Sequence, residues 1–371
     1  MRTPGLVVGR LGGVPVILTW SWAVVALVLT AAFTPQVAEV AGWGAGVGIA
    51  AGFVAALFVS VFFHEVSHGL TARRLGVQAR EYALTFFGGH TAFSGPIEGP
   101  GRSAAIAAAG PAANLVLGGA CWLGWQAADH GVAAVILYAG LVSNVFTGLF
   151  NLLPALPLDG GAILEAAIWK LTGRRETGSL AAGYLGIVAG VALCGWSLAR
   201  RSQELASAFW PLIIGMTVAQ GGWVTVRRAR QARADAALTV EQFLRPAAQA
   251  PHTALLSEVV SDLRAGRCVI VTEHATPIGY IDPSAVAALP ALPTLPALPT
   301  LPTTGAASAA NDLPVDAVMI TIPRGLGLDA SAHGAHLRAI ATAASASTAI
   351  IPVVANGSLI GVLRPADIAE G

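Results

Sequence analysis

Residues His64-Glu65-Val66-Ser67-His68 combine the side chains of a hydrolytic metal site. Two histidines four positions apart lie on one face of a helix, close enough for both imidazoles to bind one ion. A glutamate beside the first histidine can activate a metal-bound water as a general base. The motif therefore predicts a zinc site with His64 and His68 as ligands and Glu65 as the base.

The surrounding sequence places this motif in a membrane. It follows the apolar run GFVAALFVSVFF without a break and precedes Arg73 and Arg74, which predicts a position near the cytoplasmic end of a span. Three ionisable groups at that depth are costly unless they are paired, hydrated or bound to a metal. The alternative, polar residues that merely cap a span, leaves this cost unmet.

A third ligand has to come from another segment, because a catalytic zinc ion usually has three protein ligands and one position for water. Asp159 is the best candidate, since it lies in apolar sequence beside Pro154 and Pro157, which break a helix. Irregular backbone at membrane depth is tolerated only inside protein or along a wet cavity. Glu165 is the rival, but six helical residues turn it away from Asp159. An N-cap role is the structural alternative for Asp159.

The composition is that of a polytopic membrane protein. Of the 371 residues, 55% are hydrophobic and 11% are charged, against about 25% charged in soluble chains. A soluble single-domain enzyme and a disordered chain are thereby disfavoured. The net charge of +1 argues against nucleic-acid binding, and the three cysteines form no metal-binding or disulfide pattern.

Six spans are expected, and basic residues orient them. The apolar runs lie at 14–33, 44–70, 103–125, 131–150, 179–199 and 205–226. Lysine and arginine cluster on one side of these spans, which predicts cytoplasmic N- and C-termini. Arg200 and Arg201 fall on the opposite side, so the number and orientation of the last two spans stay open. The alanine- and glycine-rich composition favours a bacterial plasma membrane.

Four motifs together resemble those of the site-2 protease family of intramembrane zinc metalloproteases. They occur in the family's order over about residues 50–170: HEVSH, the Gly pair in Phe87-Gly88-Gly89, Gly110-Pro111-Ala112-Ala113-Asn114, and NLLPALPLDGG at 151–161. The resemblance implies a bundle of about six transmembrane helices with a re-entrant β-hairpin at the glycine pair. That hairpin would offer an edge strand to an unwound substrate.

The resemblance also implies roles for individual residues. One zinc ion would be bound by His64, His68 and Asp159, with Glu65 as general base and then proton donor to the leaving amine.

Two asparagines and one histidine complete the expected site. Asn114 and Asn151 match family positions near the site, which implies oxyanion stabilisation or a hold on the substrate backbone; helix packing is an equal alternative. His90 follows the glycine pair, where small or apolar residues are more usual. Lining the site, occluding it, or lying at the membrane interface all stay open for His90.

After residue 226 the sequence changes to that of a connector helix, 227–249, and a soluble α/β domain, 250–371. The domain resembles a pair of CBS modules, at 250–286 and 312–371. Between them, 287–311 carries prolines at a spacing of three, which favours a polyproline II spacer.

The resemblance to CBS modules implies a ligand and a partner. Dimerisation or docking is the favoured role, with a homodimer formed through the pair. An adenine nucleotide is the alternative ligand, because Asp367 has the spacing of a ribose-contacting aspartate.

The family resemblance implies an endopeptidase that hydrolyses peptide bonds in or near transmembrane segments, as in regulated intramembrane proteolysis. A membrane-bound anti-sigma factor or transcription factor is the expected kind of substrate, with lipids as the surroundings. An ion-binding transporter or channel with a regulatory CBS tail is the alternative, but transport needs no general base beside the ligands. An inactive scaffold would lack one of the four catalytic side chains, and all four are present.

Overall fold

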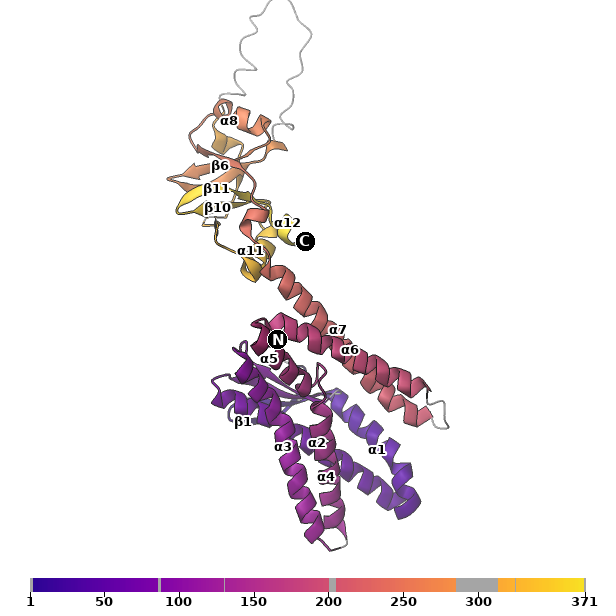
Figure 1. Ribbon diagram of the computed structural model, residues 1–371. Coiled ribbons are helices and arrows are strands. Elements are labelled where there is room, and N and C mark those ends of the chain that lie inside the picture. Colours follow the sequence, from indigo (N-terminus) through magenta and orange to yellow (C-terminus); the bar gives the residue numbers. More distant parts are fainter. Residues whose placement is uncertain are drawn as a thin grey trace, which may run out of the picture. The chain divides into compact units, whose positions relative to one another are not determined.

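The chain forms two compact units, Met1–Arg230 and Gln231–Gly371, here called the membrane unit and the tail unit (Figure 1). The structure is a computed structural model that describes residues 3–85, 88–129, 131–199, 205–284, 313–323 and 325–369. The predicted proline-rich spacer lies outside the described residues, as do Arg200 and Arg201.

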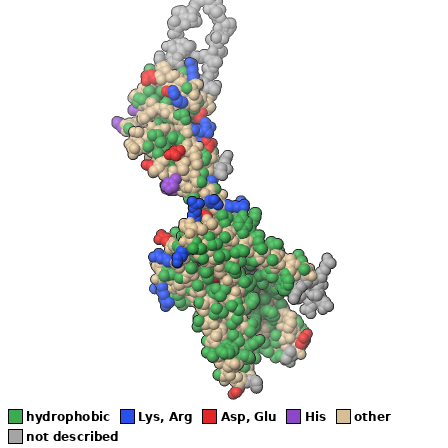
Figure 2. All heavy atoms as spheres, in the orientation of Figure 1, with side chains coloured by type: hydrophobic (Ala, Val, Ile, Leu, Met, Phe, Trp, Pro, Cys, Tyr) green, Lys and Arg blue, Asp and Glu red, His purple; other side chains and the backbone are tan. Residues whose placement is uncertain are grey.

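Helices make up most of the membrane unit. They are α1 (Trp20–Ala41), α2 (Trp43–Arg74), α3 (Pro100–Ala127), α4 (Val132–Asn151), α5 (Asp159–Thr172), α6 (Arg175–Ala199) and α7 (Leu205–Ala236). Among the described residues, six of these helices, all except α5, are long and apolar enough to cross a membrane. Hydrophobic side chains cover most of the visible face of this unit (Figure 2). These features indicate a multi-pass membrane protein.

A four-stranded sheet accompanies the helices. Its strands are β1 (Leu6–Leu11), β2 (Val14–Leu18), β3 (Ala79–Thr85) and β4 (Gly88–Phe93), in the order β1-β2-β3-β4. The outer pairs are antiparallel, and β2 runs parallel to β3. A hairpin therefore does occur at the glycine pair, whereas its re-entry into the membrane stays a prediction.

The first span begins later than the sequence analysis predicted. Residues 14–18 form β2, and α1 starts at Trp20. The run VPVIL is apolar because Val16 and Ile17 are buried in the sheet, and its β-branched residues favour a strand. Gly12 and Gly13 both have positive φ and form the turn before it.

A helix break positions the beginning of α5. The chain leaves α4 at Asn151 and forms no regular element before Asp159. The amide of Leu156 in this segment donates to the carbonyl of Ala182 on α6, at 3.1 Å. This bond holds the segment against α6, so that α5 starts at a defined point in the bundle.

The tail unit contains two small α/β halves. Strands β5 (Ala247–Pro251), β6 (Cys268–Glu273), β7 (Thr276–Ile281) and β8 (Ile320–Thr321) form one sheet, in that order. Strands β9 (Leu328–Asp329), β10 (Ile351–Ala355) and β11 (Ser358–Leu363) form the other, in the order β11-β10-β9. The helices are α8 (Leu256–Arg264), α11 (Gly334–Ser345) and α12 (Pro365–Ala369), with 3₁₀ turns at Val240–Gln242 and Val315–Ala317.

The connector helix predicted for 227–249 is wrong in its second half. Helix α7 ends at Ala236, and strand β5 begins at Ala247. Val240, between them, is 1% exposed and packs into a core with Leu337 of α11. This burial draws the chain after Ala236 into the tail unit.

An ion pair ties the end of α7 to α11 within the tail unit. Nε of Arg338 lies 2.6 Å from Oδ1 of Asp235, and both side chains are less than one-fifth exposed. Removing one partner of a largely buried pair leaves the other charge unpaired, at a cost on the order of 1–3 kcal/mol. We expect Asp235→Ala to accelerate amide hydrogen exchange in α11 about tenfold or more. Asp262→Ala, which breaks the more exposed pair with Arg267, serves as the control, and equal effects of the two changes would refute the prediction.

Candidate metal centre

Three side chains predicted to bind a metal meet at one point in the membrane unit. His64 and His68 lie one turn apart on α2, and Asp159 is the first residue of α5. Oδ2 of Asp159 lies 2.9 Å from Nε2 of His64 and 3.3 Å from Nε2 of His68. Their ligand atoms all lie within 4.8 Å of one another, and both histidines are buried.

This donor set fits a zinc ion. Two imidazole nitrogens and one carboxylate oxygen are a usual catalytic set, and donor atoms at tetrahedral angles about 2.0–2.1 Å from zinc lie roughly 3.3 Å apart. The two distances from Asp159 are close to that separation. Only small movements would therefore be needed for the three side chains to share one ion.

Hydrogen bonds at Nδ1 orient both imidazoles. Nδ1 of His64 donates to Oδ1 of Asn114 at 2.6 Å, and Nδ1 of His68 donates to the carbonyl of Ile106 at 2.7 Å. Both acceptors are on α3. A hydrogen on Nδ1 leaves the lone pair on Nε2, so these contacts present both Nε2 atoms as ligands and make them more basic.

Glu65 is buried beside this group and is held by strand β4. The hydroxyl of Thr91 donates to Oε2 of Glu65 at 2.8 Å and lies 3.0 Å from the backbone carbonyl of Glu65. Gly89 packs so closely here that a Cβ atom would lie 2.6 Å from Oε1 of Glu65. The strand therefore fixes the carboxylate at the edge of the cavity that also contains the three ligands.

The two asparagines named in the sequence analysis lie in different surroundings. Asn114 is fully buried, and Nδ2 of its amide donates to Ser60 and Asn144. Its side chain therefore orients His64 on the side of the ring away from Asp159. Asn151 lines the cavity at the metal centre, and its Nδ2 donates to the carbonyl of Thr147 at 2.9 Å. An oxyanion or substrate-holding role is more open to Asn151 than to Asn114.

The other three candidate residues have different partners. Glu165 faces the same cavity but forms an ion pair with Nε of Arg175 at 2.6 Å and is not among the grouped ligands. His90 lines the cavity, is exposed, and has Nε2 3.5 Å from the hydroxyl of Thr3. In the tail unit, Asp367 pairs with Arg245 at 2.7 Å, and its contact with a nucleotide stays a prediction.

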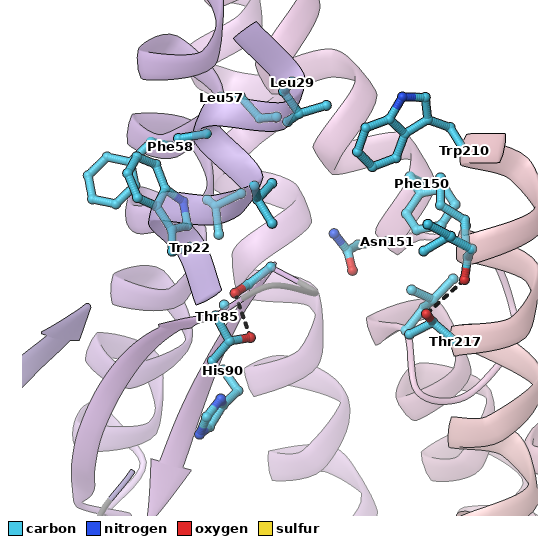
Figure 3. A pocket seen from close by; sticks show the side chains of 18 of the residues that line it. Trp22, Leu29, Leu57, Phe58, Thr85, His90, Phe150, Asn151, Trp210 and Thr217 are labelled. Carbon is cyan, nitrogen blue, oxygen red and sulfur yellow. Dashed lines mark hydrogen bonds between the residues drawn. The ribbon is translucent and has the colours of Figure 1, made fainter. Parts of the chain in front are cut away.

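A second, apolar cavity of about 490 Å³ adjoins the metal-site cavity of about 340 Å³. Residues of α1, α2 and α7 line it, and Gly89, His90, Asn151 and Pro157 line both. Trp22 and Phe58 lie on one side of it and Trp210 and Thr217 on the other, with Asn151 between them (Figure 3). An apolar cavity lined by candidate spans therefore lies next to the cavity at the metal centre.

Several supporting residues were not identified from the sequence. Thr91 has no motif, because its role depends on the register of β4 against α2. Asn144 carried a usable signal, since it is an amide within the apolar run LVSNVFTGLF, where an unpaired polar group is costly. The acceptor for His68 is a main-chain carbonyl, which no residue type reveals.

Comparisons with known proteins find a peptidase family model and relatives named as zinc metalloproteases. The family model for peptidase family M50 matches residues 52–127 and 124–195. A protein from Synechocystis named "Putative zinc metalloprotease sll0528" is 31% identical over 248 residues, covering 64% of this chain and 64% of that protein. A protein from Mycobacterium tuberculosis named "Putative zinc metalloprotease Rip3" is 29% identical over 361 residues, covering 76% of this chain and 91% of that protein.

A solved structure is similar as well. The site-2 protease from Methanocaldococcus jannaschii aligns with a TM-score of 0.47 and 24% identity, covering 60% of this chain and 96% of that one.

Gly110 on α3 leaves the room that the two imidazoles occupy. A Cβ atom there would lie 2.6 Å from Nε2 of His64 and closer still to Nε2 of His68. We expect Gly110→Ala to displace both nitrogens and to weaken zinc binding about tenfold or more, the range for a disturbed ligand shell. Zinc affinity of the purified full-length chain, measured by competition with a fluorescent chelator, checks this.

The matched control is Gly119→Ala on the same helix, where a Cβ atom would meet nothing within 4 Å. Zinc affinity close to that of the unaltered chain is expected for this variant. Unchanged affinity in Gly110→Ala would show that the imidazoles do not bind the ion in the arrangement described.

Proposed function

We propose that this chain is an intramembrane zinc metalloendopeptidase, a site-2 protease of peptidase family M50. The match of its membrane unit to the family model and the names of its relatives support this proposal. The observation that carries the proposal is the convergence of His64, His68 and Asp159 beside Glu65. The relatives' names support the assignment to zinc metalloproteases. The chain spans 64% of the cyanobacterial relative, so activity and substrate are proposed for this chain from its own site.

His64, His68 and Asp159 are the proposed zinc ligands. The ion, when bound, supplies a Lewis acid that makes water a better nucleophile and polarises a carbonyl. The buried positions of both histidines and their hydrogen bonds at Nδ1 support the assignment. Asp159 is one-fifth exposed, which leaves its side of the group open to the cavity.

Glu65 is the proposed general base. Its carboxylate takes a proton from the attacking water as the oxygen bonds to the scissile carbon. It then delivers a proton to the nitrogen as the carbon–nitrogen bond breaks, so that an acid and an amine leave. The bond from Thr91 to Oε2 fixes one carboxylate oxygen during both transfers. Proximity to the ligands in one cavity supports this role.

A transmembrane segment is the proposed substrate. The apolar cavity between α1, α2 and α7 offers room for an apolar chain beside the metal centre. β4 is the last strand in the sheet order, and its residues 88–90 line that cavity. A substrate that unwinds there can pair its backbone with the edge of β4, as in other cases of strand addition. Asn151, which faces both cavities, is the proposed contact to the substrate backbone.

The tail unit is a proposed pair of CBS modules. Two small sheets with flanking helices support this interpretation. Arg245 already pairs with Asp367, so an adenine nucleotide would have to displace that contact. A regulatory or docking role, including a homodimer, follows by analogy of fold. The chain is proposed to reside in a bacterial plasma membrane with both termini cytoplasmic, in the pathway of regulated proteolysis of a membrane-tethered regulator.

Glu65→Gln separates chemistry from metal binding. Glutamine keeps the size of the side chain but cannot accept a proton, and general acid–base catalysis contributes about 100- to 10,000-fold. We expect cleavage to fall by about that factor while zinc content stays near one ion per chain. Cleavage of single-span test proteins, reconstituted with the full chain in phosphatidylethanolamine–phosphatidylglycerol vesicles, is the measurement. An unchanged rate would exclude Glu65 as the base.

Asp159→Ala tests the third ligand. The change removes one of three donors, and we expect zinc to be lost on dialysis of the purified protein, as read by elemental analysis. Glu165→Gln is the control, because that side chain pairs with Arg175 and should leave zinc in place. Full metal content in Asp159→Ala together with loss in Glu165→Gln would transfer the ligand role to Glu165.

A further inference from the structure

We propose that Asn144, on α4, is a positioning residue that selects the tautomer of His64 through Asn114. The inference rests on the proposed zinc site. The side-chain amides concerned form a hydrogen-bonded series in the interior of the membrane unit. Asn144 is 6% exposed and Asn114 is not exposed at all.

The direction of each hydrogen bond in this series of amides follows from a main-chain carbonyl at its end, that of Gly140. Nδ2 of Asn144 lies 2.8 Å from the carbonyl oxygen of Gly140, which can only accept. Oδ1 of Asn144 must therefore face Asn114, where it accepts from Nδ2 at 2.9 Å. Oδ1 of Asn114 is thereby turned to His64 and accepts from Nδ1 at 2.6 Å. A hydrogen is thus placed on Nδ1 of His64, so that in the neutral imidazole the lone pair lies on Nε2.

Ser60 on α2 supports the same orientation. Its hydroxyl donates to the carbonyl of Ser143 at 3.4 Å and accepts from Nδ2 of Asn114 at 2.6 Å. The carbonyl of Ser60 also lies 3.3 Å from that Nδ2. A reversed Asn114 amide would bring its oxygen against this carbonyl and against Oδ1 of Asn144. Two helices, α2 and α4, therefore disfavour reversal, and the amide–amide bond is the stronger constraint because it is the shorter of the two contacts to an oxygen that only accepts, 2.9 Å against 3.3 Å.

Reversal would have a chemical consequence at the metal centre. Nδ2 of Asn114 would then donate to Nδ1 of His64, which would place the hydrogen of a neutral imidazole on Nε2. Nε2 is the atom that faces Asp159 at 2.9 Å. A hydrogen there removes the lone pair that would bind zinc, so the tautomer and the zinc affinity are coupled through Asn144.

A double-mutant cycle tests the orientation. Asn144→Leu removes the oxygen that holds Asn114, and we expect zinc affinity of the purified full-length chain to fall about tenfold. In the presence of Asn114→Asp, the same Asn144→Leu change should cause no loss, because a carboxylate accepts from His64 with either oxygen. The same loss with and without Asn114→Asp would overturn the proposal, since packing alone predicts additive effects. No loss from Asn144→Leu in the otherwise unaltered chain would overturn it as well.

Ser143→Ala is the matched control for Asn144→Leu. Ser143 is the preceding residue on α4, 1% exposed, and among the described residues its hydroxyl has no hydrogen-bond partner. Zinc affinity within about twofold of the unaltered chain is expected for a change that breaks no hydrogen bond. A tenfold loss in this control would assign the effect of Asn144→Leu to packing of α4 and would count against the proposal.

Nitrogen-15 NMR of His64 in the metal-free Asp159→Ala chain reads the tautomer without the carboxylate, which lies 2.9 Å from Nε2 and would accept a hydrogen from it. Comparison with the same chain carrying His64→Gln assigns the signal. The hydrogen should be on Nδ1 in Asp159→Ala and shift toward Nε2 when Asn144→Leu is added. An Nε2 hydrogen in Asp159→Ala alone would overturn the proposal. Neither readout uses a substrate, so a chain that binds zinc but cleaves no membrane protein would refute the proposed function and leave this inference standing.

Discussion

The hydrogen bond from His64 to Asn114 shows the constraint on which the membrane unit depends: a polar group in an apolar interior is costly unless it finds a partner within the protein. An unpaired amide or imidazole in an apolar interior costs roughly 1–3 kcal/mol by mutational measures and more in hydrocarbon. The structure meets this cost with contacts between α2, α3 and α4, the helices that carry His64, Asn114 and Asn144. The same hydrogen bonds therefore join these helices and orient a metal ligand.

The same constraint explains the break between α4 and α5. A helix that ends inside a bundle leaves carbonyl and amide groups without helical partners. Here the amide of Leu156 bonds to α6, and the amide of Leu158 bonds back to the carbonyl of Ala155. Asp159 then occupies the first turn of α5, where the positive end of the helix dipole favours a carboxylate. The irregular segment places an anion opposite two histidines that lie 95 and 91 positions earlier in the chain.

The sequence identified the parts of the site that are encoded by residue type and spacing. HEVSH gave two donors and a base on one helix face, and the prolines around Asp159 marked a helix break with an acid beside it. The sequence marks Asn144 as an amide within an apolar run, but it could not reveal the partners of Asn144, Thr91 or Ile106, because all three meet the site only through tertiary packing. Asn114 was found through its motif, with an oxyanion or substrate-holding role and helix packing as equal alternatives, but the motif did not show that its amide would contact Ser60, Asn144 and His64.

The features of the fold that the sequence did not predict have a similar origin. Hydropathy merged 14–18 with the first span, since a buried strand and a membrane helix are equally apolar over a short run. The parallel pairing of β2 with β3 joins segments more than 60 residues apart, as Val16 and Tyr82 illustrate, and no local pattern encodes that contact. In the tail, the basic helix-like run continued past Ala236 in sequence, but burial of Val240 ended the helix.

Strand β4 links the proposed chemistry to the proposed substrate. Thr91 on this strand holds Glu65, while Gly88, Gly89 and His90 line the apolar cavity. Successive residues of a strand point to opposite faces, so its edge remains available for backbone pairing while one side chain serves the base. A substrate backbone paired with β4 would therefore lie beside Glu65 without a further element to position it. Because a helical segment has no free backbone donors to pair, this arrangement favours substrates whose helix has already opened at the cleavage point.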